Sequence, residues 1–99
     1  MIQWLPPSSC FPPHRVTHPD KAAELEAAFR DAGWDLRRPV LVGYPVPGEG
    51  RIQLLSGSHR WAAAERAGIQ IPVRIVPYSR VRSSWGCLVR WLHLMREGD

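Results

Sequence analysis

The feature that most constrains the fold of this sequence is a strand-like run that passes through a glycine directly into a helix-like run. Residues 51–55 alternate polar and apolar side chains, as a half-buried strand does. Ser56-Gly57-Ser58 breaks this alternation, and the alanine-rich residues 59–67 then favour a helix that Gly68 ends. A strand joined this closely to a helix predicts a domain in which a sheet packs with helices.

The residues before this junction predict an arm, a helix and a first strand. Two proline pairs in residues 1–16 exclude a helix there, so we expect an extended, irregular N-terminal arm. A helix is predicted from Thr17 or His18 to Gly33, with Pro19 in its first turn. The apolar residues 39–44 then predict a buried strand, which forms a hairpin with residues 51–55.

The residues after the junction predict a third strand and a last helix. Residues 71–76 form the strand, and Pro72 at its start and Pro77 at its end suggest an exposed edge of the sheet or a boundary. Ser83 or Ser84 begins the helix, whose apolar stripe consists of Trp85, Leu88, Val89, Leu92 and Met95. We therefore expect an α/β (α+β) domain over residues 17–99, in which a short mixed sheet packs with helices.

The size and composition of the chain agree with one small globular domain. The 99 residues include 44% hydrophobic and 22% charged residues. No run approaches the roughly 20 apolar residues of a membrane span, and no secretory signal is visible at the N-terminus. We therefore expect a cytoplasmic protein without a membrane partner, in which Cys10 and Cys87 are free thiols.

The turn from Gly57 to Arg60 is the strongest candidate for a binding site. The first turn of a helix has unpaired backbone N–H groups and the positive end of the helix dipole, and both attract anions. His59 and Arg60 add positive charge where it disfavours the helix itself, which suggests an anionic ligand. The alternative is an ordinary turn in which Ser58 caps the helix and Arg60 pairs with an acid such as Glu65.

Residues 14–82 resemble the ParB N-terminal/sulfiredoxin superfamily. The matching segments, in order, are His18-Pro19-Asp20-Lys21, Pro39-Val40-Leu41-Val42, Leu55-Ser56-Gly57-Ser58-His59-Arg60, Ala67-Gly68 and Ile71-Pro72-Val73. The resemblance implies a small ParB/sulfiredoxin-like fold in which Gly57, Ser58, His59 and Arg60 meet ligand phosphates. It also implies that the ligand is a nucleotide such as ATP, ADP or CTP, which Mg²⁺ would accompany.

The resemblance also suggests ligand contacts for residues outside the turn, and it argues against sulfiredoxin activity. Lys21, the only lysine of the chain, matches a nucleotide-contacting lysine of sulfiredoxins, although a solvated helix residue is the alternative. Arg15 would add a contact from the arm. Ser58 takes the position of the sulfiredoxin cysteine, so we do not expect sulfiredoxin activity. Glu24 and Ala28 replace two hydroxyl residues of the sulfiredoxin helix, so the nucleotide would bind in a different pose.

Three hypotheses for the function follow from these observations. The first is a nucleotide-binding or phosphate-binding domain, which as an enzyme would be a nucleotide hydrolase or phosphotransferase; its catalytic residues are unknown. The second is a nucleic-acid-binding accessory protein that contacts backbone phosphates, in agreement with a net charge of +4. The third is a non-catalytic protein-interaction module, with the C-terminal helix contacting a second copy or another protein.

Other side chains are weaker candidates for metal binding, catalysis or partner contacts. His14 and His18 are four residues apart, but the proline-rich arm argues against a helical metal site, and we predict no metal site built from these side chains. Asp31, Asp35 and Glu49 are unpaired candidates for a general base. Of the five tryptophans, we expect Trp34 and Trp85 in the core, whereas Trp91 lies off the apolar stripe and suggests a partner surface.

Overall fold

The computed structural model describes residues 2–83 of the chain. Its elements are β1 (Ile2–Leu5), the 3-10 turn η1 (Pro7–Ser9), β2 (Cys10–Phe11), α1 (Pro19–Ala32), β3 (Leu41–Pro45), β4 (Ile52–Leu54), α2 (Ser58–Ala67), β5 (Ile71–Ile75) and α3 (Tyr78–Ser83). The strands form one sheet in the order β1-β5-β3-β4-β2, in which parallel and antiparallel pairs alternate. The predicted α+β domain with a short mixed sheet is confirmed.

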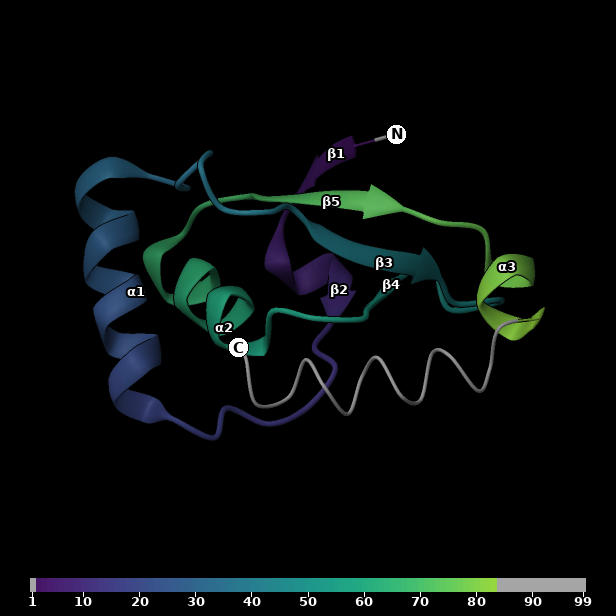
Figure 1. Ribbon diagram of the computed structural model, residues 1–99, viewed down its shortest axis with the longest axis horizontal. Helices are drawn as coiled ribbons and strands as arrows, with labels where there is room; N and C mark the ends of the chain where they lie inside the picture. Colours follow the sequence, from purple (N-terminus) through teal and green to yellow (C-terminus); the bar gives the residue numbers. More distant parts are fainter. Residues whose placement is uncertain (1, 84–99) are drawn as a thin grey trace.

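The helices α1 and α2 pack side by side against one face of the sheet (Figure 1). The apolar side chains of α1, which include Leu25 and Phe29, lie in one cluster with Leu41 of β3 and Val73 of β5. Pro19 begins α1 and Gly33 ends it with a φ of 74°. The local capping signals therefore predicted both ends of this helix correctly.

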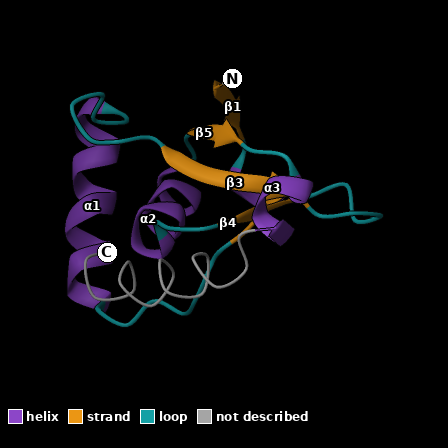
Figure 2. Cartoon of the chain, turned by 45° about the vertical axis from the view of Figure 1, so that its right-hand side comes forward, coloured by secondary structure: helices purple, strands orange, loops and turns teal. Residues whose placement is uncertain are grey.

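The opposite face of the sheet is contacted by α3. Val42 and Tyr44 alternate with the core-facing residues of β3, and they pack against Leu55 and Val81. Figure 2 shows α3 at the end of the sheet away from α1. A helix over Tyr78–Ser83 was not predicted, and the predicted apolar stripe of the last helix lies outside the described residues.

Two sequence expectations about the strands were wrong. The N-terminal arm is extended, but it is not irregular, because β1 and β2 form the two edges of the sheet. β5 is an interior strand, with β1 on one side and β3 on the other. Pro72 is tolerated there because β3 pairs with β5 only from Val73 onwards, so the missing N–H lies before that ladder.

In the hairpin of β3 and β4, the position of Gly43 has no room for a side chain. A Cβ atom at this position would lie 2.6 Å from Cγ2 of Ile52 and 2.9 Å from the carbonyl oxygen of Gln53. β4 then passes through Leu55 and Ser56 into α2, as predicted. Among residues 2–83, no helix has the length and apolar character that a membrane crossing requires.

Candidate functional site

The turn before α2 is built around a glycine that no other residue can replace without strain. Gly57 is the N-cap of α2 and has a φ of 90°, a conformation that L side chains rarely adopt. A Cβ atom on Gly57 would also collide with Cδ2 of Leu41. Ser58 is the first residue of the helix rather than its cap, and no side chain caps this end. Because Leu41 belongs to β3, the backbone at Gly57 lies against this strand at the point where it enters α2.

Residues 14–18, which we call the strap, lie over the N-terminal end of α2 and are held by two of its side chains. The Oγ atom of Ser58 accepts a hydrogen bond from the backbone N–H of His14 at 3.1 Å. Nε2 of His59 accepts the backbone N–H groups of Thr17 at 3.2 Å and His18 at 3.0 Å. Both side chains are fully buried, with 0% exposure.

Arg60, the third residue of α2, holds the start of β3. Its Nη1 donates a hydrogen bond to the carbonyl oxygen of Pro39 at 2.6 Å. Its guanidinium carbon lies 5.6 Å from the ring centroid of Trp34, which stacks on Phe29 at 5.2 Å. Trp34 is buried, as predicted. Three consecutive residues of α2 thus anchor the strap, the start of α1 and the approach to β3.

The structure brings only part of the predicted phosphate site together. Gly57, Ser58 and His59 lie beneath the strap, and Arg15 is an exposed residue of the strap itself. The side chains of Ser58, His59 and Arg60 bond to the protein backbone. Contact of these side chains with a ligand phosphate therefore stays a prediction.

Lys21 lines an open hollow at the first turn of α1, which we call the N-terminal hollow. This hollow has a volume of about 490 Å³ and is lined by Thr17, His18, Pro19, Asp20, Lys21 and Glu24. It begins at the residues whose backbone N–H groups bind His59, so it adjoins the buried turn of α2. Lys21 was a candidate from the sequence, whereas Thr17 of the strap, which lines the same hollow, was not.

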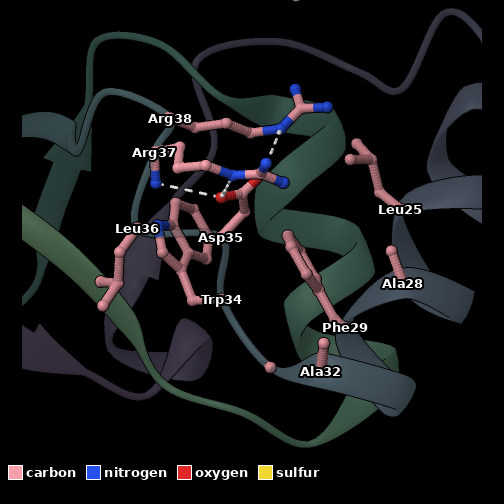
Figure 3. Close-up of a pocket in the computed structure, with 10 residues that line it drawn as sticks. Leu25, Ala28, Phe29, Ala32, Trp34, Asp35, Leu36, Arg37 and Arg38 are labelled. Carbon is pink, nitrogen blue, oxygen red and sulfur yellow. Dashed lines mark hydrogen bonds and ion pairs between the residues drawn. The ribbon is translucent and has the colours of Figure 1, made fainter.

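A second hollow, which we call the C-terminal hollow, lies between the second half of α1 and residues 33–38. Its volume is about 340 Å³, and its apolar wall includes Ala28, Phe29 and Trp34. Figure 3 shows the Asp35 carboxylate at its rim, bonded to Arg37. Within the described part of the chain, Nε1 of Trp34 is a buried donor for which no hydrogen-bond acceptor is found.

The charges at this rim form a small ion-pair group. Asp35 accepts a side-chain hydrogen bond from Nε of Arg37 at 3.0 Å, and Nε of Arg38 lies 3.8 Å from its other oxygen. The hydrogen bonds from Arg37 hold the pKa of the Asp35 carboxyl below its usual value. Asp35 therefore stays ionised at neutral pH and orients both guanidinium groups.

Metal and thiol chemistry have few candidate groups among residues 2–83. His14 and His18 lie near His59, with ring centroids 6.1 and 5.6 Å from its ring. No group of three or more His, Cys, Asp or Glu side chains in this part of the chain is arranged to hold a metal ion. Cys10 is a buried free thiol, and burial raises its pKa.

Comparison with known proteins finds solved structures with a similar fold, but no family or curated protein with a similar sequence. No protein-family model matches the sequence, and no curated protein matches it either. Among solved structures, ParB from Caulobacter crescentus, a chromosome-partitioning protein complexed with CTP-gamma-S, matches with a TM-score of 0.63 and 25% identity. Sulfiredoxin from Arabidopsis thaliana matches with a TM-score of 0.62 and 25% identity. The chain has a ParB/sulfiredoxin-like fold.

The two matched structures differ in the share of their own length that the alignment covers. The alignment covers 84% of this chain and 94% of the sulfiredoxin chain. It covers 78% of this chain but only 44% of the ParB chain. A free serine kinase in complex with AMP shares the fold at 19% identity, with a TM-score of 0.58 over 77% of this chain and 30% of the kinase. The ParB/sulfiredoxin-like fold predicted from the turn and its flanking segments is confirmed.

Proposed function

We propose that this domain binds a nucleotide where the first turn of α1 meets the N-terminal end of α2. The observation that carries the proposal is the N-terminal hollow beside Lys21, which adjoins the buried turn at His59. Two solved relatives of the same fold support it, since one was solved with CTP-gamma-S and another with AMP. The predicted ligands ATP, ADP and CTP belong to the same chemical class.

The side chains of the N-terminal hollow suit the phosphate end of a nucleotide. Lys21 and His18 supply cationic and hydrogen-bonding groups at the start of a helix, where the dipole also favours negative charge. Asp20 and Glu24 are one helical turn apart and line the same hollow. Mg²⁺ usually binds one or two carboxylates together with phosphate oxygens, so these two residues are the ones that would hold it.

The C-terminal hollow suits the base. Lys21, Glu24 and Ala28 share one face of α1, because residues three and seven apart are neighbours along a helix. Glu24 lines the N-terminal hollow, and Ala28 lines the C-terminal hollow. Seven residues of helix extend about 10 Å, so a nucleotide lying along this face would reach both hollows, with its base near Trp34.

The buried hydroxyl at the turn argues against sulfiredoxin chemistry. Ser58, which takes the position of the sulfiredoxin cysteine, has no exposed surface and accepts a hydrogen bond from the strap. A serine hydroxyl is also a much weaker nucleophile than a thiolate. Hydrolysis or transfer of a phosphoryl group remains the class of reaction that we would test first once binding is established.

A thermal-shift experiment with ATP, ADP, AMP and CTP tests this proposal. A ligand that binds only the folded chain raises its melting temperature with increasing concentration. We expect at least one nucleotide to do so, and we expect Lys21→Ala to reduce the shift strongly. Arg66→Ala is the matched control, because it removes one positive charge at the other end of α2. No shift with any nucleotide, or equal loss in both variants, would contradict the proposal.

Nucleic-acid binding is the second candidate, because the ParB relative is a chromosome-partitioning protein. The net charge of +4 agrees with an anionic polymer as partner. Binding to DNA or RNA through phosphates would weaken steeply as salt increases. Salt-insensitive binding, or none, would remove this candidate while leaving the nucleotide proposal intact.

A further inference from the structure

The strap is held over α2 largely by one imidazole nitrogen. Nε2 of His59 accepts two backbone N–H groups, from Thr17 at 3.2 Å and from His18 at 3.0 Å. A ring nitrogen can accept these bonds only if it carries no proton. The ring must therefore be the neutral tautomer with its proton on Nδ1. The contact between strap and helix thus depends on the protonation state of a fully buried side chain.

A second proton on His59 would reverse the role of Nε2. In the imidazolium form both ring nitrogens are donors, so Nε2–H would point at two backbone N–H groups. Both hydrogen bonds would be lost together, and a charge would be buried in a site with 0% exposure. The strap would then retain the bond from the backbone of His14 to Ser58 and the 3.5 Å contact of Nε2 with the Thr17 hydroxyl, whose oxygen can accept a proton donor.

The segments that meet at His59 carry more positive than negative charge. The charged residues and histidines of these segments are His14, Arg15 and His18 in the strap, Asp20 and Lys21 at the start of α1, and Arg60 in the first turn of α2. The rings of His14 and His18 lie 6.1 and 5.6 Å from the His59 ring. Of these residues Arg15, Lys21 and Arg60 are cationic and Asp20 alone is acidic, so the net charge of the segments disfavours a further positive charge on His59.

We propose that His59 is an acid-sensitive latch, and that protonation of its Nε2 by solvent releases residues 14–18 from the N-terminal end of α2. Release would uncover the first turn of α2, the part of a helix that attracts anions. The latch would therefore connect access to the turn with pH. This inference rests on the hydrogen bonds between residues 14–18 and α2 and does not require that a nucleotide binds.

Amide hydrogen exchange on the full chain, followed by NMR from mildly alkaline to mildly acidic pH, tests the latch. Protection of the Thr17 and His18 amides is measured relative to their intrinsic exchange rates. It should fall by up to about tenfold for each unit by which the pH is lowered, as expected when release of the strap takes up one proton. The Val73 amide in β5 should keep its protection, which shows that the fold is intact. Protection of the strap that does not change with pH would overturn the proposal.

Two variants test whether the pH dependence of strap protection comes from His59. His59→Gln keeps an oxygen acceptor without a titrating group, so strap protection should become independent of pH. The double variant His14→Gln/His18→Gln should keep the native pH response, because the backbone N–H of His18 is unchanged. A pH response that persists in His59→Gln, or that disappears in the double variant, would overturn the proposal.

A direct measurement in the native chain covers the case in which His59→Gln does not fold. Long-range proton–nitrogen correlations of the His59 ring report which nitrogens carry protons. We expect the Nδ1–H tautomer at mildly alkaline pH and a doubly protonated ring in the pH range in which the strap opens. A ring that stays neutral while the strap opens would overturn the proposal.

Discussion

The guanidinium of Arg60 lies 5.6 Å from the ring centroid of Trp34, and the same group donates a 2.6 Å hydrogen bond to the carbonyl oxygen of Pro39. A cation-π contact and a charge-assisted hydrogen bond are therefore combined in one buried side chain. This arrangement links the first turn of α2 to the loop that leads into β3. The candidate site consequently depends on Arg60 for its shape.

Arg60→Ala should destabilise the fold by about 2 to 4 kcal/mol, because it leaves the Pro39 carbonyl without this donor and opens a cavity beside Trp34. Urea unfolding monitored by circular dichroism measures the change. Arg66→Ala, at the exposed end of α2, should change the free energy of unfolding by no more than about 0.5 kcal/mol. Equal stabilities of the two variants would show that the Arg60 contacts contribute little.

Gly57→Ala should be more harmful than Gly48→Ala, although both glycines have positive φ angles of 90° and 79°. The Cβ atom at Gly48 meets nothing within 4 Å, so that variant reports only backbone strain of about 1 to 2 kcal/mol. At Gly57 the added carbon also collides with Leu41, and overpacking adds about 1 to 3 kcal/mol. Comparison of the two unfolding midpoints measures the difference, and equal losses would argue against close packing at the turn.

The helices α1 and α2 and the hairpin of β3 and β4 could be predicted from sequence because their signals are local. Pro19 and Gly33 lie at the ends of α1, and Gly57 and Gly68 flank α2, so each boundary is set by residues next to it. The strands β1 and β2 could not be predicted in the same way. Their partners, such as Arg74 for Ile2, are far away in the sequence, and a pair of prolines follows each segment directly.

The turn of the candidate site was found from sequence, but the roles of its side chains were not. The positive φ of Gly57 has a clear local signal, whereas the bonds from His59 to Thr17 and His18 depend on the path of the strap. No periodicity in residues 14–18 indicates that path. For the same reason α3 was missed, since only Val81 of its described side chains is buried.

Cys10 should react slowly with alkylating reagents in the native chain. Burial raises the pKa of this thiol, so the reactive thiolate is rare at mildly alkaline pH. Because the folded pKa lies above the unfolded one, the associated stability is lost as pH rises through the folded pKa. Mass spectrometry of iodoacetamide-treated Cys87→Ser protein checks this, with guanidinium-unfolded protein as the fast reference. Equal rates in folded and unfolded protein would contradict the buried position.

The pKa of Asp35 should rise in Arg37→Ala and change less in Arg38→Ala. The hydrogen bonds from Arg37 hold this pKa below its usual value, whereas Nε of Arg38 is 3.8 Å away. The small stability that this pair provides is present above the unfolded pKa and is lost as pH falls through the folded one. An NMR titration of the carboxyl carbon measures the shift, and an unchanged pKa in Arg37→Ala would exclude the assigned cause.

The most direct test of nucleotide binding at the junction of α1 and α2 is an NMR titration of the labelled full chain with ATP, ADP and CTP. The account predicts saturable shifts of the amide signals of Lys21, Ala28 and residues 57–60 with at least one of them. The amide of Val81 in α3, on the other face of the sheet, should not move. Shifts confined to α3 and β1, or none with any nucleotide, would contradict the account.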